Sequence, residues 1–328
     1  MAMSLEEFLS EWENDSPYIE VKTSGSTGEP KRMLVEKRRM LNSARITCDF
    51  LGLHKDDTAL LCMSLDYIAG KMMVVRSIER GLKLIVQEPN GHPMASSHSV
   101  DFAAMIPMQV YNSLQVPEER ERLMRIKHLI IGGGAIDDVM AAELKTFPNA
   151  VWSTYGMTET LSHIALRRLS GPKASEWYTP FPSVRVSLSD ESCLIIDAPE
   201  VCPELLITND IAELKQRGQS PCVCPDFRIL GRKDNVICSG GLKLQAEEIE
   251  RELKPFLRVP YLISKRPDEK FGEVVILLTE GSVDEAREVC LHVLPKYHQP
   301  RAYIHLDHIP LTETGKPARK LVAQPMTS

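Results

Sequence analysis

Residues 22–31 read KTSGSTGEPK. Small hydroxyl residues alternate with glycines over Ser24–Gly28, and a proline and a lysine follow. This composition favours a loop over a helix or a central strand, because glycine, serine and threonine prefer turns and proline lacks a backbone donor. We expect a hydroxyl-lined loop that ends in a cation, Lys31.

An anion is the natural ligand of such a loop. Backbone N–H groups exposed by glycines form an anion-binding nest, and Lys31 adds a positive charge. The stretch is not a Walker A motif, because Pro30 separates the last glycine from the lysine. A solvated hairpin loop is the alternative.

The sequence after the loop predicts an α/β large domain with parallel sheet layers. Short apolar runs alternate with helical patterns, as in TALLCMS (58–64), HLIIGGG (128–134) and AVWSTYG (150–156). A β-rich subdomain is expected over about 181–230, because short strand patterns follow one another there. We also expect a small, mobile α+β domain at the C-terminus. The predicted bounds are 1–230 for the large N-terminal domain, 231–235 for the hinge and 236–328 for the small domain.

The composition and net charge of the chain argue against some classes of binding partner. The chain has 328 residues and a net charge of −6, which argues against nucleic acid or an anionic membrane surface as the main partner. We expect no membrane span and a cytoplasmic protein, since no segment has the ~20 apolar residues that a span needs. Cys222 and Cys224 lack a second ligand pair at zinc spacing, so reduced thiols are favoured over a metal site.

Three further segments follow the loop in a particular order. They are STYGMTET (153–160), GRKDNVICSGGLKLQAEEIE (231–250) and LTETGKPARK (311–320). Together with the loop they resemble the core motifs of the adenylate-forming superfamily, which includes acyl-CoA synthetases, adenylation domains and luciferases. The resemblance spans residues 23–320 and implies a nucleotide-binding enzyme that activates a carboxylic acid with ATP.

The resemblance assigns roles around ATP. The loop would wrap the β- and γ-phosphates, Thr158 would contact the α-phosphate, and Glu159 would hold Mg²⁺, which prefers carboxylate and phosphate oxygens. Asp210 would bind the ribose hydroxyls, although Asn209 stands where the family usually has glycine. The implied ATP- and AMP-binding residues are Thr23, Ser24, Gly25, Ser26, Thr27, Gly28, Lys31, Gly133, Gly134, Ala135, Tyr155, Gly156, Asp210 and Arg232.

A purely structural role remains an alternative for three of these residues. Tyr155 is either a platform for adenine or ordinary core packing. Glu159 is either the metal ligand or a carboxylate stabilised at a helix N-terminus. Asp210 is either the ribose ligand or an exposed residue at a strand end.

Lys316 is implied as a catalytic residue, together with Thr158 and Glu159. The family lysine at this position reaches the substrate carboxylate and the α-phosphate, where it stabilises charge in the transition state. The C-terminal domain would then rotate about Asp234 and present a coenzyme A face to the site. The residues of that face are Ser239, Gly240, Gly241 and Lys243.

The segment SLDYIAGKMMVVRSIERGLKLIV and its neighbours are most similar to o-succinylbenzoate–CoA ligases of menaquinone biosynthesis. Such a substrate needs a pocket that mixes apolar walls with cations or donors. The candidate acyl-pocket residues are Tyr67, Lys71, Thr160, Ser162 and His163. His163 is equally well explained as a packing histidine, and Asp66-Tyr67 replaces the aromatic–histidine pair that the family commonly has.

The stretch before the loop is much shorter than in most of the superfamily. We expect a homodimer or a tighter repacking to cover the exposed sheet. Two alternatives to a CoA ligase remain: an enzyme that loads a carrier-protein thiol, and a catalytically degenerate nucleotide-binding protein.

Overall fold

The computed structural model describes residues 3–22, 32–96, 99–134, 136–217, 223–310 and residue 319. The chain forms two compact units. The first comprises Met1–Val186, Ile196–Leu206 and Leu214–Arg228, and the second comprises Ser187–Ile195, Ile207–Glu213 and Ile229–Ser328.

A seven-stranded sheet forms the centre of the first unit, in the order β4-β3-β5-β6-β7-β8-β9. The strands from β4 to β7 are parallel, while β8 and β9 are antiparallel additions. The strand bounds are β3 (Thr58–Leu61), β4 (Lys83–Val86), β5 (Phe102–Met105), β6 (His128–Ile131), β7 (Ala150–Gly156), β8 (His163–Arg168) and β9 (Thr179–Pro180). This confirms the predicted α/β class with a parallel sheet.

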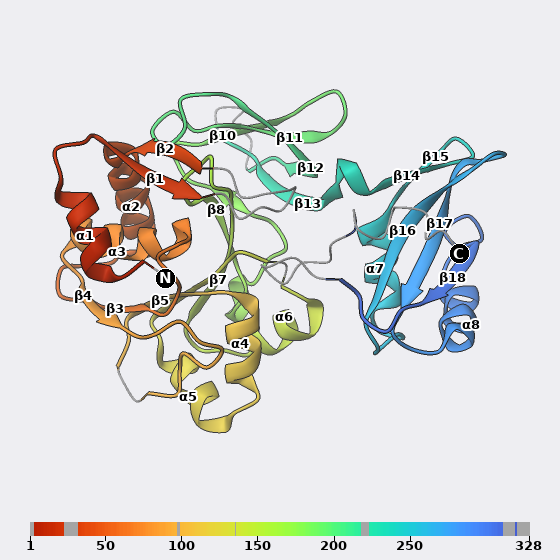
Figure 1. Ribbon diagram of the computed structural model, residues 1–328, viewed down its shortest axis with the longest axis horizontal. Coiled ribbons are helices and arrows are strands. Elements are labelled where there is room, and N and C mark those ends of the chain that lie inside the picture. Colours follow the sequence, from red (N-terminus) through yellow and green to blue (C-terminus); the bar gives the residue numbers. More distant parts are fainter. Residues whose placement is uncertain are drawn as a thin grey trace. The chain divides into compact units, whose positions relative to one another are not determined.

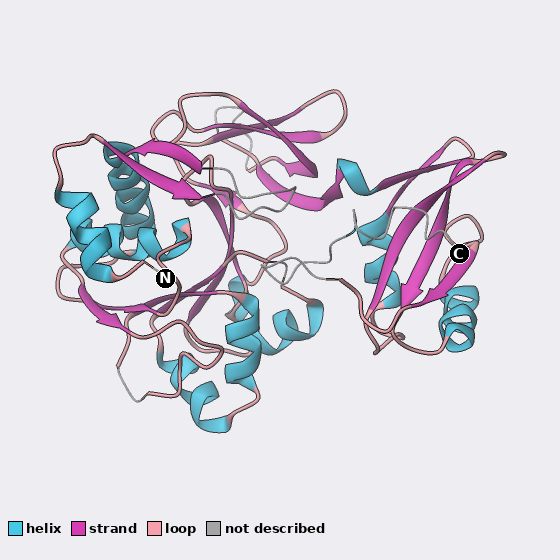
Figure 2. Ribbon diagram, viewed as in Figure 1, coloured by secondary structure: helices cyan, strands magenta, loops and turns pink. Residues whose placement is uncertain are grey.

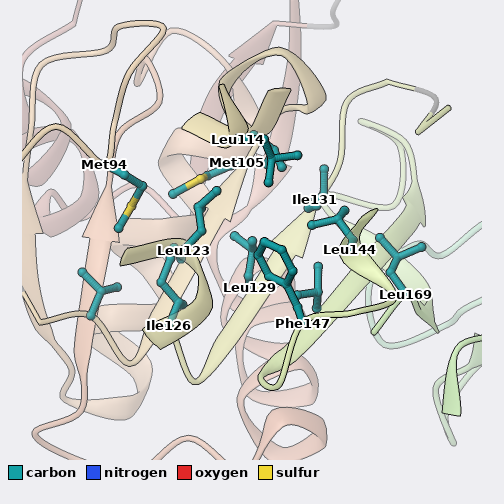
Figure 3. Packing of buried hydrophobic residues seen from close by; sticks show 14 of the residues in the cluster. Met94, Met105, Leu114, Leu123, Ile126, Leu129, Ile131, Leu144, Phe147 and Leu169 are labelled. Atoms are coloured by element: carbon teal, nitrogen blue, oxygen red, sulfur yellow. The ribbon is translucent and has the colours of Figure 1, made fainter. Parts of the chain in front are cut away.

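Helices cover both faces of this sheet (Figure 1). They are α2 (Lys37–Leu51), α3 (Ile68–Arg80), α4 (Pro107–Leu114), α5 (Pro117–Arg125) and α6 (Asp138–Leu144). Side chains on both faces of the central strands β5 and β6 are buried, as expected for parallel strands between two layers of helices. On the α4–α6 face, Leu129 of β6 packs with Leu123 of α5 and Phe147 after α6 (Figure 3).

The N-terminal elements flank the predicted phosphate loop. Helix α1 (Leu5–Glu13) begins at Ser4, whose hydroxyl and Glu7 form a reciprocal capping box. Strands β1 (Tyr18–Lys22) and β2 (Arg32–Glu36) pair antiparallel, with Lys22 opposite Arg32. The loop of residues 23–31 therefore connects two paired strands, although it lies outside the described residues.

Four strands form a second sheet in the order β10-β11-β12-β13, in which each strand neighbours the next one in the sequence. They are β10 (Arg185–Leu188), β11 (Cys193–Asp197), β12 (Leu206–Lys215) and β13 (Asp226–Arg232). The β-rich stretch that the sequence predicts from about residue 181 is thus present as a meander.

The C-terminal part of the second unit is a five-stranded sheet with two helices (Figure 2). Its strands are β14 (Val236–Ser239), β15 (Leu242–Gln245), β16 (Tyr261–Asp268), β17 (Gly272–Thr279) and β18 (Ala302–His305), and its helices are α7 (Ala246–Leu253) and α8 (Val283–Val293). The helices pack on one face through Ile249, Leu253 and Cys290. This is the predicted α+β architecture.

Candidate active site

The carboxyl ends of β6 and β7 meet at one edge of the parallel sheet. His128 to Ile131 pair in register with Ala150 to Ser153, so the glycines after β6 and Tyr155 near the end of β7 lie at the same edge. In open α/β sheets this edge is where ligands bind. The structure thus places Gly133, Gly134 and Tyr155, which the resemblance assigns to the nucleotide, at the same edge of the sheet.

Tyr155 is part of an aromatic group in the first unit. Its ring centroid lies 5.0 Å from that of Phe227 and 5.8 Å from that of Tyr178. The side chain is only partly buried, so this packing fixes the ring and leaves some of its surface exposed. This packing agrees with the core-packing interpretation of Tyr155, and its role as a platform for adenine stays a prediction.

A tight turn follows β7. A side chain at Gly156 would place its Cβ 2.2 Å from the carbonyl oxygen of Ser162, so only glycine fits. The hydroxyl of Thr160 donates to that same oxygen over 2.7 Å and accepts from the Met157 N–H over 3.1 Å. Thr160 is fully buried and holds the turn closed.

This turn buries Thr158 and exposes Glu159. Residues 158–162 form turns and bends, and no helix begins among them. The alternative of Glu159 as a helix N-terminal carboxylate is therefore wrong. An exposed carboxylate suits Mg²⁺, which takes one or two protein carboxylates and completes its shell with water and substrate phosphates. Among the described residues no group of three or more His, Cys, Asp or Glu could hold a metal alone.

His163 is buried at the start of β8. Its Nε2 lies 3.1 Å from the hydroxyl of Thr47, and its Nδ1 lies 3.1 Å from the hydroxyl of Ser162. Burial lowers the pKa of His163 well below 6.5, with Arg76 as a second cause. The imidazole is neutral and both nitrogens have partners, which favours the packing explanation over a role as an acyl-pocket donor.

Arg76 is a functional candidate that the sequence analysis missed. It is only 2% exposed, and its Nη2 donates to the Ser162 hydroxyl over 2.6 Å. Its buried Nε has no hydrogen-bond partner, and no carboxylate of the described residues pairs with it. Burial lowers the pKa of this guanidinium to about 10. A buried cation without a counter-ion is costly and marks a place where an anion would be stabilised.

Lys71 lies apart from this group. It is 3% exposed, with its Nζ 3.9 Å from the Oε2 of Glu11 and 5.4 Å from the ring centre of Phe8. Burial lowers the pKa of Lys71, which neighbouring carboxylates partly offset. It lines a charged cavity of about 140 Å³ together with Met3, Glu11, Glu20, Lys22, Arg32 and Asp66. The structure therefore does not bring Lys71 together with Ser162 and His163.

The Asp66-Tyr67 departure from the family pattern has a structural explanation. Asp66 accepts a hydrogen bond from the Met3 backbone N–H over 3.2 Å and another from the Ser64 hydroxyl over 3.0 Å. Tyr67 precedes α3, is 41% exposed, and forms an isolated parallel bridge with Lys22. Asp66 thus connects Met3, which precedes α1, to the residues that precede α3.

A second group of predicted residues lies in the second unit. The Nη1 of Arg232, at the end of β13, lies 3.6 Å from the Oδ1 of Asp210 on the neighbouring β12. Its Nη2 lies 3.6 Å from the Oδ2 of Asp234, in the 3₁₀ turn that follows. The Asp210 backbone N–H donates to the Thr208 hydroxyl over 3.1 Å, which fixes the strand locally. The structure therefore brings Asp210, Arg232 and Asp234 together.

The predicted coenzyme A face is a β-hairpin. Ser239 pairs with Leu242 across a two-residue turn, in which Gly240 and Gly241 have φ values of 58° and 87°. Two positive φ angles are what a tight hairpin turn requires, so the glycines have a local structural reason. Lys243 on β15 is exposed and available to an anionic ligand.

The remaining predicted residues lie outside the described part of the chain. They are Thr23, Ser24, Gly25, Ser26, Thr27, Gly28, Lys31, Ala135 and Lys316.

The sequence is similar to a known protein family and to several known enzymes. Residues 6–209 match the family described as AMP-binding enzyme. A 2-succinylbenzoate–CoA ligase of Lactococcus lactis is 22% identical over 92% of this chain and 69% of its own length. One of Listeria monocytogenes is 24% identical over 94% of this chain and 70% of its own length.

Solved structures agree on the fold. An acyl-CoA synthetase (AMP-forming)/AMP-acid ligase II-like protein of Dyadobacter fermentans is 29% identical, with a TM-score of 0.65 over 96% of this chain and 91% of that one. The o-succinylbenzoate CoA synthetase of Bacillus subtilis, solved with its acyl-adenylate intermediate, is 21% identical, with a TM-score of 0.75 over 92% of this chain and 68% of that one. None of the helices in the described residues is long and apolar enough to cross a membrane.

Proposed function

The chain belongs to the AMP-binding enzyme family, and from this premise we propose that it is an AMP-forming acid–CoA ligase whose acid is o-succinylbenzoate. The observation that carries the ligase chemistry is the edge formed by β6 and β7, where the glycines, Tyr155 and the Thr158–Glu159 turn gather. The identity of the acid draws on the names of the relatives, several of which are 2-succinylbenzoate–CoA ligases. It would place the protein in menaquinone biosynthesis.

The first half-reaction joins the acid to AMP. A carboxylate oxygen of the acid attacks the α-phosphorus of ATP, the bond to the β-phosphate oxygen breaks, and pyrophosphate leaves. Tyr155 would face the adenine and Asp210 would accept hydrogen bonds from the ribose. Thr158 and Lys316 would stabilise the charge that develops on the α-phosphate. Mg²⁺, held by Glu159 and the phosphates, would neutralise the leaving group.

The second half-reaction releases AMP. The thiolate of coenzyme A attacks the acyl carbonyl, and the bond to the AMP oxygen breaks. We propose that a small domain of residues 236–328 turns about Asp234 in the 231–235 hinge between the two steps, relative to the large domain of residues 1–230. Such a rotation would remove Lys316 and bring the Ser239–Lys243 hairpin to the site.

Arg76 suits the second carboxylate of o-succinylbenzoate. A benzoate or a fatty acid has one carboxylate, which the adenylation step uses, whereas o-succinylbenzoate has another that remains charged. A carboxylate beside Ser162 would supply the counter-ion that Arg76 lacks among the described residues. We assign Arg76 this role in place of Lys71, whose Nζ faces Glu11.

Acid-dependent exchange of pyrophosphate into ATP tests the proposal. We expect exchange with o-succinylbenzoate and much less with benzoate, succinate or a fatty acid. Exchange with another acid alone would overturn the assigned substrate. The absence of exchange with every acid would favour the degenerate nucleotide-binding protein.

The thiol that accepts the acyl group is identified by a separate measurement. We expect AMP release to depend on free coenzyme A and to be indifferent to a carrier protein. The reverse dependence would favour the carrier-loading alternative.

A further inference from the structure

Four polar side chains in the first unit form a continuous network of hydrogen bonds from Arg76 to Thr47. Arg76 on α3 donates from its Nη2 to the Ser162 hydroxyl over 2.6 Å. That hydroxyl lies 3.1 Å from the Nδ1 of His163, the first residue of β8. The Nε2 of His163 lies 3.1 Å from the hydroxyl of Thr47 on α2, which donates to the carbonyl of Ser43 over 3.0 Å. The Arg76–Thr47 network therefore joins α3 to α2 through the start of β8.

The arginine end of the network determines the direction of its first bonds. A guanidinium has hydrogen-bond donors and no acceptor, so the Ser162 oxygen accepts from Arg76. The single hydrogen of the Ser162 hydroxyl is then directed at the Nδ1 of His163. For this bond to form, Nδ1 must be the unprotonated nitrogen of the ring.

The threonine end leads to the same ring tautomer independently. Thr47 gives its single hydrogen to the Ser43 carbonyl within α2, so its oxygen accepts from the Nε2 of His163. That bond requires a hydrogen on Nε2. Burial lowers the pKa of His163 well below 6.5, so the neutral ring has one hydrogen to place. Both ends of the network thus select the tautomer with its hydrogen on Nε2.

This direction of bonds decides what Ser162 contributes to the site. Its hydrogen is directed at His163 and its oxygen accepts from Arg76, so the hydroxyl has no donor left for a bound acid. Among the described residues the Nε of Arg76 has no partner, and its Nη1 has the sulfur of Met73 at 3.9 Å. The guanidinium is thus fixed at one nitrogen, and other N–H groups remain for a carboxylate.

We propose that Thr47 and His163 are positioning residues for recognition of the acid. Thr47 sets the tautomer of His163 with its hydrogen on Nε2. This tautomer turns the Ser162 hydroxyl so that its oxygen holds the guanidinium of Arg76 in one orientation. The inference rests on the proposed function and adds Thr47 to it. It gives Ser162 and His163 the role of supporting Arg76 in place of contacting the acid.

A purely structural role for Thr47 makes a different prediction. Thr47 is fully buried in α2, so loss of its hydroxyl would then change only the stability of the protein. Lower stability reduces the amount of active enzyme and leaves the KM for the acid and the hydrogen position on the His163 ring unaltered. The ring tautomer and the KM for the acid therefore separate the two roles.

Nuclear magnetic resonance of the full chain measures the tautomer without any substrate. The protein is labelled with ¹⁵N-histidine, and the signal of His163 among the nine histidines is identified by its absence in His163→Gln. Correlation of ring nitrogens with ring hydrogens shows which nitrogen is protonated. We expect a protonated Nε2 in the parent protein and in Thr47→Ser. In Thr47→Val the Nε2 hydrogen loses its acceptor, so the population should shift toward a hydrogen on Nδ1.

Pyrophosphate exchange measures the consequence for the acid. Thr47→Val should raise the KM for o-succinylbenzoate by about 3- to 10-fold, as expected for the loss of one positioned hydrogen bond. The KM for ATP should stay that of the parent, and Thr47→Ser should restore the KM for the acid. In Arg76→Leu the network has lost the group that it positions, so adding Thr47→Val should raise the KM no further.

Ser77→Ala is the matched control. The buried Ser77 hydroxyl donates over 3.0 Å to the carbonyl of Met73, four residues earlier in α3. This is the same kind of bond within a helix as that of Thr47 to Ser43. Because Ser77 lies outside the Arg76–Thr47 network, its variant should keep the parent tautomer of His163 and both parent KM values.

Several outcomes would overturn the inference. A hydrogen on Nδ1 of His163 in the parent protein, or on both ring nitrogens, would do so before any kinetics. A parent KM for the acid in Thr47→Val would also contradict it, as would an equal rise in the KM for ATP. Absence of exchange in the parent protein with every acid would count against the proposed function, whereas a tautomer with its hydrogen on Nε2 in that case would still confirm the direction of the network.

Discussion

The Nη1 of Arg232 lies 3.6 Å from the Oδ1 of Asp210, which joins the end of β13 to the middle of β12. Both side chains are part of the proposed ribose site, and the ion pair orients the carboxylate. We predict that Asp210→Ala raises the KM for ATP by about 10- to 100-fold, because two hydrogen bonds to ribose hydroxyls are lost. Exchange kinetics at varied ATP concentrations will measure this.

Asp307→Ala is a suitable control for this variant. Asp307 is fully exposed in the same unit, so its removal should leave the KM for ATP unchanged. The sequence alternative of an exposed residue at a strand end is wrong, because Asp210 lies within β12 and its side chain is 18% exposed. An unchanged KM in Asp210→Ala as well would show that Asp210 does not bind the ribose.

Arg76→Leu should separate stability from activity. Replacing a buried cation that lacks a counter-ion with an apolar side chain is expected to keep or raise the melting temperature. Exchange with o-succinylbenzoate should fall by about 10-fold or more, as expected for a lost charge-assisted contact. Thermal unfolding and exchange assays on the same preparation test both parts.

The control for Arg76 is Arg45→Leu, which removes a half-exposed arginine that pairs with Glu79 over 3.1 Å. It should leave exchange unchanged. A lower melting temperature in Arg76→Leu with full exchange activity would assign Arg76 to the core and remove it from the site.

His163 predicts a pH dependence of stability. The pKa of the buried imidazole lies well below 6.5, so the folded protein keeps it neutral while the unfolded chain takes up a proton as the pH falls through about 6.5. The unfolded state then binds more protons, and the free energy of unfolding decreases as the pH falls below that value. The contribution amounts to about 1 kcal/mol per pH unit.

His163→Gln should therefore flatten the dependence between about pH 7 and pH 5.5. Chemical unfolding at several pH values gives the slope, which is independent of any overall loss of stability in the variant. His54→Gln, at an exposed position, should retain the parent slope. A parent slope in His163→Gln would place the proton uptake elsewhere.

Asp66→Ala tests the explanation of the Asp66-Tyr67 pair. If Asp66 only fastens the Met3 N–H and the Ser64 hydroxyl, its loss should lower the free energy of unfolding by about 1 kcal/mol. The kinetics of exchange with o-succinylbenzoate should remain those of the parent. Asp57→Ala, which removes the acceptor of the His54 N–H in another loop, is the control, and a change in the KM for the acid in Asp66→Ala alone would return Asp66 to the acyl pocket.

Elements with strong periodicity could be predicted from the sequence. The apolar runs TALLCMS, HLIIGGG and AVWSTYG correspond to the observed β3, β6 and β7. Helix α5 was missed because it is almost wholly charged and buries only Glu119 and Leu123. A hairpin was considered for residues 22–31, but its strands β1 and β2 were not predicted, because charged residues interrupt their apolar positions.

The order of the motifs identified the family, whereas the environment of individual candidate residues required the side-chain geometry. Arg76 lies within the apolar stretch MMVVRSI (72–78), in which it is the one charged residue. Only the fold shows that this position points into the protein and lacks a counter-ion among the described residues. Likewise, Lys71 and His163 are equivalent candidates in the sequence, but Lys71 contacts Glu11 and His163 contacts Thr47.

The buried guanidinium of Arg76 offers a practical route to the natural acid. An anion that neutralises Arg76 relieves an electrostatic penalty as well as adding contacts, so it should shift the thermal transition more than an uncharged molecule of equal size. A panel of mono- and dicarboxylates, screened by differential scanning fluorimetry without ATP or coenzyme A, would rank ligands before any turnover is measured. The buried guanidinium would then act as a built-in sensor for acids with a spare carboxylate.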